Sequence, residues 1–319
     1  MARTSDPREL FDQALGGDRG ALARLLSLIE RGGEPARAVG RLAYPRSGEA
    51  YTVGMTGAPG AGKSTLTSAT IGHLRSLGLE VAVLAIDPSS PFTGGAILGD
   101  RVRMQDHATD PGVFIRSMAT RGHLGGLALA TPEAVRLLDA IGRRWILVET
   151  VGVGQVEVEV AGKADTTVVV VNPGWGDSVQ ANKAGLMEIA DVFVINKADR
   201  KGVDETRRDL EQMLELSDLP SDAWRPPIVP TIASTGEGVE ALWDAVLAHR
   251  TYAEESGVLA ERRAFRSGEE LREIVTNRLR EKAKALCTGD RWDELSEAVV
   301  TQAVDPWTAA DEMLGGIDA

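Results

Sequence analysis

The chain has 319 residues, of which 43% are hydrophobic and 26% charged, as expected for a soluble globular protein with one large domain plus appendages, or with two ordinary domains. Its formal net charge of −12 argues against general nucleic-acid binding, because such a surface repels phosphate backbones. No apolar run approaches the ~20 residues of a membrane helix, and the N-terminus lacks the apolar stretch of a secretory signal. We therefore expect a cytoplasmic protein with no membrane partner.

Residues 1–46 predict an N-terminal helical extension. Apolar side chains recur there at helical spacing, at Leu10, Phe11, Leu15, Leu22, Leu25, Leu26 and Ile29. The glycine pair at 32–33 ends this run, and a further short helix is expected over residues 35–42.

Residues 47–250 alternate short apolar runs with amphipathic segments. The apolar runs are rich in β-branched residues and several are apolar on both faces, as strands of a buried parallel sheet must be: 51–57, 80–87, 112–117, 144–150, 166–172, 191–196 and 226–231. Helices are expected between them at 64–77, 131–142, 178–190, 203–216 and 236–249. This order predicts an α/β fold of the P-loop NTPase type, doubly wound around a mostly parallel sheet.

Residues 251–319 predict a C-terminal helical arm that carries no catalytic motif. A long charged helix over 257–286 has its apolar residues on one side, at Phe265, Leu271, Ile274, Val275 and Leu279, and shorter helices are expected at 292–302 and 305–314. Such a stripe fits a dimerisation arm, and it fits equally a helix that packs on its own domain. The sequence leaves both arrangements open.

A phosphate-binding loop begins at Gly57. The run Gly57-Ala58-Pro59-Gly60-Ala61-Gly62-Lys63-Ser64 matches G-x-x-x-x-G-K-[ST], follows a predicted strand, and leads through Thr65 into a predicted helix. Its glycines let backbone N–H groups turn toward the β-phosphate, and the helix N-terminus adds partial positive charge. Lys63 is expected to reach the β- and γ-phosphates, and the Ser64 hydroxyl to ligate Mg²⁺.

The choice of base is indicated further along the chain. The strand at 191–196 ends in Asn196-Lys197-Ala198-Asp199, and a carboxylate there can accept both N1–H and the 2-amino group of guanine. Adenine offers neither donor, so it would leave the carboxylate unpaired, and GTP is expected rather than ATP. Lys197 is expected to lie along the base plane. Ala233, in the loop 230–238, is expected to offer a backbone N–H on the guanine side.

Three acidic residues lie where a P-loop enzyme places its magnesium ligands or their neighbours. Asp87 and Glu149 end predicted strands, and Asp100 lies in the glycine-rich segment between them. The tetrapeptide from Glu149 to Gly152 takes the place of the usual D-x-x-G motif, so the Gly152 N–H is expected to sense the γ-phosphate. Lys63 and Glu149 are the expected catalytic residues. Because no Gln directly follows Gly152 and no arginine finger is assigned, we expect slow intrinsic hydrolysis that a partner or dimer contact accelerates.

Taken together, these motifs resemble the MeaB/ArgK family of G-protein chaperones. The stretches that carry the resemblance are "GAPGAGKST", "AIDPSSPFTGGAILGDRVRM", "FIRSMATRGHLGGLA", "VETVGVGQ", "PGWGDSVQANKAGLMEIAD" and "NKAD". The resemblance extends over nearly the whole chain. It implies a dimeric GTPase that binds an adenosylcobalamin-dependent acyl-CoA mutase, with methylmalonyl-CoA mutase as the expected partner. The GTPase would gate the loading of adenosylcobalamin and protect the mutase from inactivation.

The resemblance also assigns roles to residues. The family's magnesium-region acids fall on Asp87, Asp100 and Glu149, and its third switch falls on "GWGDSVQANK". Asp177, Gln180 and Lys183 of that segment are therefore the residues expected to couple the nucleotide state to the mutase.

The alternative is a metallochaperone-type GTPase that delivers a metal cofactor to another enzyme. Such proteins hold their metal in Cys/His clusters, whereas this chain has one Cys and four His without metal-ligand spacing. A direct cobalamin site is not expected either, because the D-x-H-x-x-G ligand motif is absent from the sequence. The expected cofactors are GTP or GDP and Mg²⁺. Which acyl-CoA mutase is served stays open.

Overall fold

The computed structural model describes residues 6–87, 105–107, 109–119, 124–150, 163–174, 188–216, 220 and 223–315. The chain divides into two compact units, Met1–Arg266 and Ser267–Ala319. The three segments expected from the sequence, 1–46, 47–250 and 251–319, were defined by their expected roles. These boundaries stay predictions. Within the described ranges, no helix has both the length and the apolar character needed to cross a membrane.

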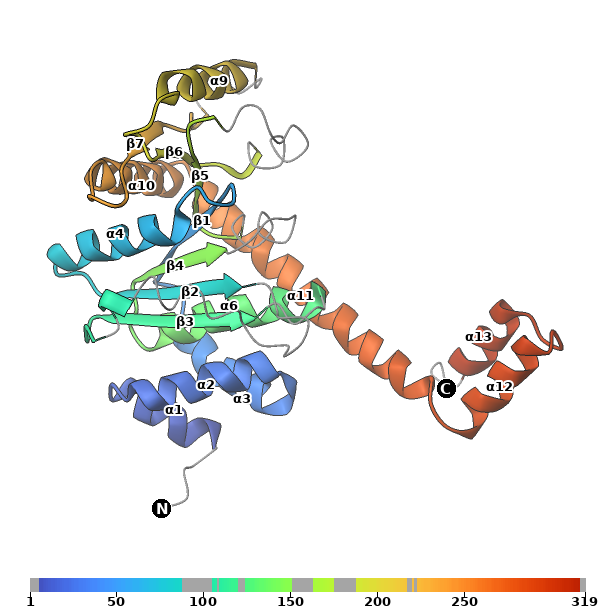
Figure 1. Cartoon of the computed structure of the whole chain (residues 1–319). Helices are drawn as coiled ribbons and strands as arrows, with labels where there is room; N and C mark the ends of the chain where they lie inside the picture. The colour runs from blue at the N-terminus through green and yellow to red at the C-terminus, as the bar shows by residue number, and fades with distance from the viewer. Residues whose placement is uncertain are drawn as a thin grey trace. The chain divides into compact units, whose positions relative to one another are not determined.

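A single parallel sheet forms the centre of the first unit (Figure 1). Within the described residues its strand order is β3-β2-β4-β1-β5-β6-β7, and every pair of neighbouring strands is parallel. The strands are β1 (Tyr51–Gly57), β2 (Val81–Asp87), β3 (Val113–Ala119), β4 (Trp145–Thr150), β5 (Thr166–Val171), β6 (Val192–Asn196) and β7 (Ile228–Thr231). The chain therefore has the predicted doubly wound α/β fold, and each predicted strand is present within one or two residues of its expected bounds.

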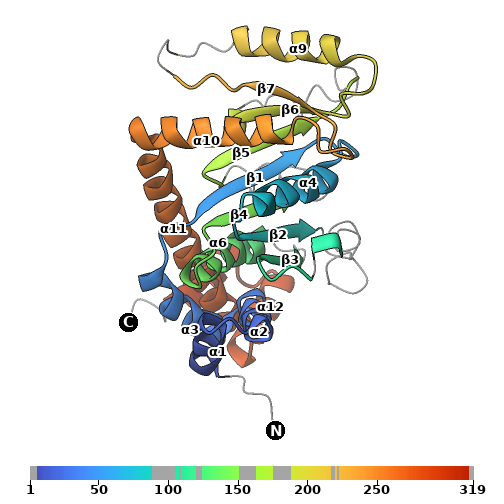
Figure 2. The same cartoon turned by 90° about the vertical axis from the view of Figure 1, so that its left-hand side faces the viewer.

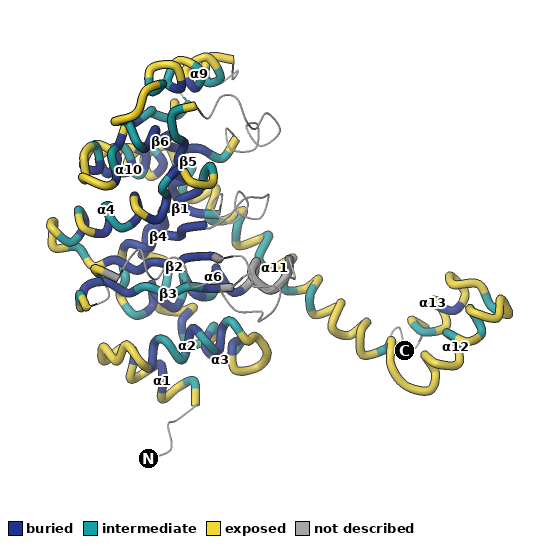
Figure 3. The backbone as a smooth tube through the Cα atoms, in the orientation of Figure 1, coloured by how far each residue is buried: buried dark blue, intermediate teal, exposed yellow. Residues whose placement is uncertain are grey.

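Helices cover both faces of this sheet (Figure 2). On one face, α4 (Lys63–Ser76) and α10 (Val239–Glu255) bury Leu66 and Val246 against Val53 and Met55 of β1. On the other face lies α6 (Leu124–Ala140), and α9 (Val203–Leu216) packs over β5 and β6. In the burial view of Figure 3 the inner strands β4, β5 and β6 are buried along their whole length, which explains why their sequences are apolar on both faces, whereas the edge strands β3 and β7 are only partly buried.

The predicted N-terminal extension is helical. It consists of α1 (Pro7–Leu15), α2 (Arg19–Arg31) and α3 (Gly33–Ala43), followed by the short turn η1 (Tyr44–Arg46). Asp6 and Asp18 cap the first two helices by accepting backbone N–H bonds. Their apolar faces join α6 in one core, and Arg116 of β3 pairs with Glu30 of α2 at 2.9 Å. The three helices thus cover α6 and the β3 side of the sheet.

Two helices of the central region have bounds that differ from the prediction by several residues. α6 begins at Leu124 rather than 131, ends at Ala140 rather than 142, and contains Pro132 within its length. α10 begins at Val239 rather than 236, because Gly236 and Gly238 adopt positive φ in the preceding turn, and it continues to Glu255. The helix expected at 178–190 lies outside the described residues except for its last three positions. A short turn, η2 (Gln105–His107), precedes β3.

The C-terminal segment is helical as predicted. It contains α11 (Val258–Leu286), α12 (Asp290–Val300) and α13 (Pro306–Leu314). In the second unit, Leu295 of α12 and Ala309 of α13 are buried. On α11, Leu271, Val275 and Leu279 lie one turn apart and are 63%, 49% and 60% exposed, so they form a largely uncovered apolar stripe.

Two buried carboxylates lie at the amino ends of the central strands, where the first turns of α11 meet the sheet. Asp165 accepts hydrogen bonds from Arg263 at 2.7 and 3.1 Å and from Arg266, and Asp191 accepts bonds from Arg262 at 3.0 and 3.1 Å. Burial by itself raises the pKa of both carboxyl groups. The hydrogen bonds and charges of their partners outweigh burial, so both pKa values lie below the ordinary range.

These depressed pKa values predict that the protein loses stability in acid. A carboxyl group with a lowered folded-state pKa stabilises the fold fully above its unfolded pKa of about 3.9, and this stabilisation is lost as the pH falls through the folded value. Below about pH 4 the unfolding free energy should fall with decreasing pH, with a slope that approaches roughly 2.7 kcal/mol per pH unit from these two groups. Urea unfolding between pH 3 and 6 measures the slope. Asp165→Asn or Asp191→Asn should each remove the contribution of one proton, which lowers the slope by about 1.4 kcal/mol per pH unit. An unchanged slope in both variants would contradict the prediction.

Candidate nucleotide-binding site

The phosphate loop connects β1 to α4. It leaves β1 at Gly57, whose φ is 134°, and enters α4 at Gly62, whose φ is 92°. A Cβ atom on Gly57 would overlap the backbone of Val170 in β5, and one on Gly62 would lie 2.5 Å from Asn196 Nδ2. Glycine is thus required at both ends by close packing as well as by backbone conformation.

Side-chain donors hold the carbonyl groups of the loop. Lys63 Nζ donates to Gly57 O at 2.9 Å and to Ala58 O at 3.2 Å, and Lys197 Nζ donates to Gly60 O at 2.5 Å. The first turn of α4 has backbone N–H groups without acceptors inside the helix. The two lysine ammonium groups occupy these carbonyl oxygens of the loop, and the N-terminus of α4 is adjacent. The loop is therefore suited to bind an anion such as a phosphate.

Asn196 joins the phosphate loop to the guanine-side segments. Its side chain is 1% exposed, and its Nδ2 donates to Ala61 O at 2.7 Å. Its Oδ1 accepts bonds from the Ala233 backbone N–H at 3.1 Å and from the Thr231 hydroxyl at 3.2 Å. One amide therefore connects the ends of β1, β6 and β7, and the predicted Ala233 N–H donates to Asn196 in this structure.

The residue that is expected to read the base lies just beyond Asn196. Lys197 has a positive φ of 60°, which turns the chain sharply after β6, and the turn is closed by the Arg200 N–H bond to Lys197 O at 3.0 Å. Asp199 lies in this turn and is exposed, so its carboxylate can reach a ligand. Pro59, Ser64 and Thr65 lie in the phosphate loop and the first turn of α4, as the motif requires.

The carboxyl ends of β2 and β4 bring two of the predicted magnesium-region acids close to the phosphate loop. Glu149 is fully buried near the end of β4 and is paired in register with Met55 of β1 and with Ala85 of β2. Asp87 is the last residue of β2, and its side chain lies outside the described part. Ser64 is 4% exposed at the start of α4. Hydroxyl and carboxylate oxygens are the ligands that Mg²⁺ prefers, so the donor types fit this metal.

Several predicted residues lie outside the described residues. They are Asp100, Gly152, Asp177, Gln180 and Lys183, and their roles stay predictions. Within the part of the chain that the structure describes, no three His, Cys, Asp or Glu side chains gather into a metal site.

Sequence reasoning missed two residues that shape the guanine side. Thr231 ends β7 and donates to Asn196, and the 230–238 turn depends on Gly238, where a Cβ would overlap the carbonyl group of Pro230. A threonine at a strand end and a glycine before a helix are common, so neither carries a distinctive signal.

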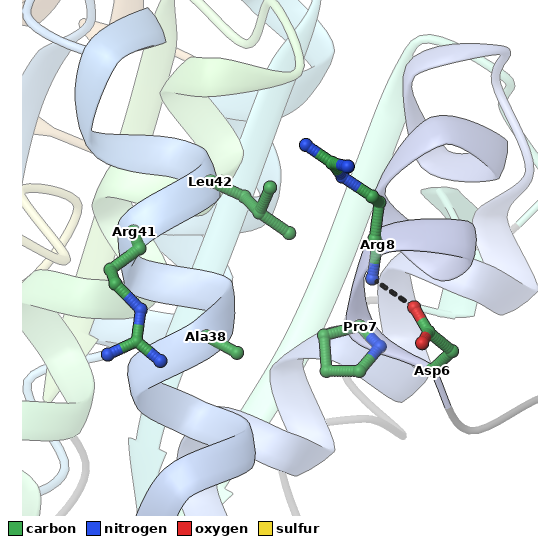
Figure 4. Close-up of a pocket in the computed structure, with 6 residues that line it drawn as sticks. All are labelled: Asp6, Pro7, Arg8, Ala38, Arg41 and Leu42. Atoms are coloured by element: carbon green, nitrogen blue, oxygen red, sulfur yellow. Dashed lines mark hydrogen bonds between the residues drawn. The ribbon is translucent and has the colours of Figure 1, made fainter.

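A separate pocket of about 310 Å³ lies between the start of α1 and α3 (Figure 4). It is lined by Asp6, Pro7, Arg8, Ala38, Arg41 and Leu42. None of these residues belongs to a nucleotide motif, and the Asp6 carboxylate caps α1 by accepting the Arg8 backbone N–H at 2.7 Å. The phosphate loop, and not this pocket, is the candidate functional site.

Comparison with known proteins gives a consistent result. Residues 22–288 match the family described as "Methylmalonyl Co-A mutase-associated GTPase MeaB". A Pyrococcus abyssi protein that carries the name of a GTPase is 53% identical over 317 residues, which cover 97% of each chain. The mouse methylmalonic aciduria type A homolog, a mitochondrial protein, is 33% identical over 323 residues, covering 96% of this chain and 78% of the mouse protein.

A solved structure has the same fold over its full length. The crystal structure of a protein described as a LAO/AO transport system kinase superposes with a TM-score of 0.72 and 28% identity, and the alignment covers 100% of both chains. The likeness therefore includes the helical segments before and after the sheet as well as the sheet itself.

Proposed function

We propose that this chain, which belongs to the MeaB family of methylmalonyl-CoA mutase-associated GTPases, gates the loading of adenosylcobalamin into an adenosylcobalamin-dependent acyl-CoA mutase and protects that enzyme. Methylmalonyl-CoA mutase is the first candidate. The observation that carries the proposal is the family match over residues 22–288, which contain both the phosphate loop and the guanine motif. The name of the mouse relative, which refers to methylmalonic aciduria, supports the same partner.

The chain's own residues suggest how GTP is bound and hydrolysed. Lys63 already lies across the phosphate loop, so it can exchange its bonds to Gly57 and Ala58 for β- and γ-phosphate oxygens. Asp199 accepts the guanine donors, and Asn196 holds the base-reading turn against the phosphate loop. Mg²⁺, when bound beside Ser64 and the acids of β2 and β4, would neutralise charge on the phosphate oxygens.

Coupling to the mutase is assigned to the segment around Asp177, Gln180 and Lys183. This segment follows β5 in the chain, and β5 pairs with β1, the strand that leads into the phosphate loop. We also propose that the protein is a homodimer, because Leu271, Val275 and Leu279 present an uncovered apolar stripe on α11. A cytoplasmic location and the lack of a direct cobalamin site complete the proposal.

A binding experiment tests this proposal. The full chain, loaded with GDP or with a non-hydrolysable GTP analogue, is titrated into purified methylmalonyl-CoA mutase and is also used to capture partners from a cell lysate. We expect the mutase to bind, with a Kd that differs between the two nucleotide states by at least about fivefold, the lower end of typical allosteric coupling. Recovery of no acyl-CoA mutase subunit in either state would refute the chaperone role and leave the GTPase activity standing.

A further inference from the structure

The amino ends of β1, β5 and β6 are fastened together by the two buried carboxylates. Asp165 precedes β5 and accepts the backbone N–H of Thr52 in β1 at 2.9 Å. Asp191 precedes β6 and accepts the backbone N–H of Thr167 in β5 at 2.8 Å. Each carboxylate thus joins its own strand to the neighbouring one.

A buried histidine adds a second set of connections. His249 of α10 is 0% exposed, with its Nδ1 at 2.8 Å from the Thr166 hydroxyl and its Nε2 at 3.1 Å from Asp191 Oδ1. The Thr166 hydroxyl lies 2.7 Å from the hydroxyl of Tyr51. Burial raises the pKa of Tyr51 to about 12, so its hydroxyl keeps its proton at neutral pH. These contacts connect α10 with the first residues of β1 and β5 and with Asp191, which precedes β6.

The arginines of α11 complete this network and compensate its charge. Arg262 binds Asp191, and Arg263 and Arg266 bind Asp165. Arg263 also donates to the carbonyl of Ala50, just before β1, at 2.8 Å. Without these partners the two buried carboxylates would be strongly destabilising, because a buried charge needs a compensating charge and hydrogen bonds.

The same three strands carry the nucleotide motifs at their other ends. β1 leads into the phosphate loop, and the backbone N–H of Ala58 in that loop donates to Val170 O of β5 at 3.1 Å. β6 ends at Asn196, whose side chain binds Ala61 O of the same loop at 2.7 Å. The loop and the guanine motif therefore meet only when β1, β5 and β6 are correctly aligned along their length.

We propose that Arg262, Arg263 and Arg266 are positioning residues of the nucleotide site, acting from the opposite end of the sheet. They hold Asp165 and Asp191 in place, the carboxylates hold the three strands in alignment, and this alignment brings the phosphate loop against Asn196. The nucleotide-binding unit accordingly includes the first turns of α11, up to Arg266. The inference concerns guanine nucleotide binding and does not depend on the mutase partner.

The first test uses variants of the full-length chain. Arg262→Gln combined with Arg263→Gln should raise the Kd for GDP at least tenfold, measured by calorimetry at a temperature where circular dichroism shows a folded protein. Arg262→Lys with Arg263→Lys, which keeps the charge, should restore part of the affinity. Arg272→Gln, which removes an exposed arginine paired with Glu269 on the same helix, is the control and should leave the Kd unchanged. A folded double variant with a lower melting temperature and a Kd within twofold of the wild type would overturn the proposal.

A second test needs no variant and therefore decides the question even if the double substitution does not fold. Coupling between two sites is reciprocal, so GDP binding must strengthen the network at the amino ends. GDP binding should slow hydrogen exchange at the amides of Thr52 and Thr167. The factor of slowing there should be at least ten times the factor at Leu84, a buried residue of β2 that reports general stabilisation. Equal slowing at all three amides would overturn the proposal.

Discussion

Asp199→Asn is expected to lower the affinity for GDP by roughly 10⁴-fold, the lower end of the discrimination shown by a site that is built for hydrogen bonding and is then mismatched. Asp199 lies in the exposed turn after β6, where its carboxylate can accept N1–H and the 2-amino group of guanine. An asparagine directs an N–H₂ group at that 2-amino group, so donor meets donor. Xanthine carries a carbonyl oxygen at this position, and the variant should therefore bind xanthosine diphosphate better than the wild type does.

Calorimetric titration with GDP, ADP and xanthosine diphosphate measures this exchange of base preference. Asp204→Asn is the matched control, since Asp204 is an exposed acid at the start of α9, and it should leave all three affinities unchanged. If Asp199→Asn kept its affinity for GDP and gained none for xanthosine diphosphate, another group would read the base and the assignment of Asp199 would be wrong.

The central sheet could be predicted from the sequence because its signals are local. Runs such as 166–171 consist of β-branched residues that are buried on both faces, and strands of this type alternate with amphipathic helices. The phosphate loop was equally clear, since Gly57, Gly62 and Lys63 occur at fixed spacing between a strand and a helix. Local spacing was sufficient for both predictions.

The network at the amino ends of the strands could not be predicted in this way. Asp165 and Asp191 each follow an alanine and precede an apolar strand, a repetition visible in the sequence as "ADTTVVVV" and "ADVFVIN". Their arginine partners lie 71 to 101 residues further along the chain. In sequence these arginines look like the solvated face of a charged helix, and only the tertiary structure brings them to the carboxylates.

The bonds of Asn196 illustrate the same limit at the nucleotide site. Its motif identified a guanine-binding turn, but its contacts to Ala61, Thr231 and Ala233 span 35 to 135 residues of sequence. The pattern predicts which residues face the ligand, because the ligand's chemistry is known. It carries no information about which neighbours hold those residues in place.

Gly57→Ala is expected to have the largest effect on stability, a loss of about 4 kcal/mol or more together with the loss of GDP binding. The added Cβ would overlap the carbonyl oxygen of Val170 and lie 2.7 Å from its carbonyl carbon and its backbone nitrogen. Val170 belongs to β5, a fully buried strand paired on both sides, so it cannot move away without breaking the β1–β5 and β5–β6 pairings. Urea unfolding and GDP titration of the full chain measure the two effects.

Gly60→Ala separates steric overlap from backbone conformation. Gly60 lies in the same loop and also has a positive φ, of 69°, but a Cβ there would meet no atom within 4 Å. Its substitution should cost only the roughly 1–2 kcal/mol of a left-handed conformation in a non-glycine residue. Both glycines lie in the same loop and have positive φ. The difference in unfolding free energy between the two variants therefore measures the close contact of β1 with β5. If both variants unfolded at the same urea concentration, the phosphate loop would not be packed against Val170 as tightly as the structure places it.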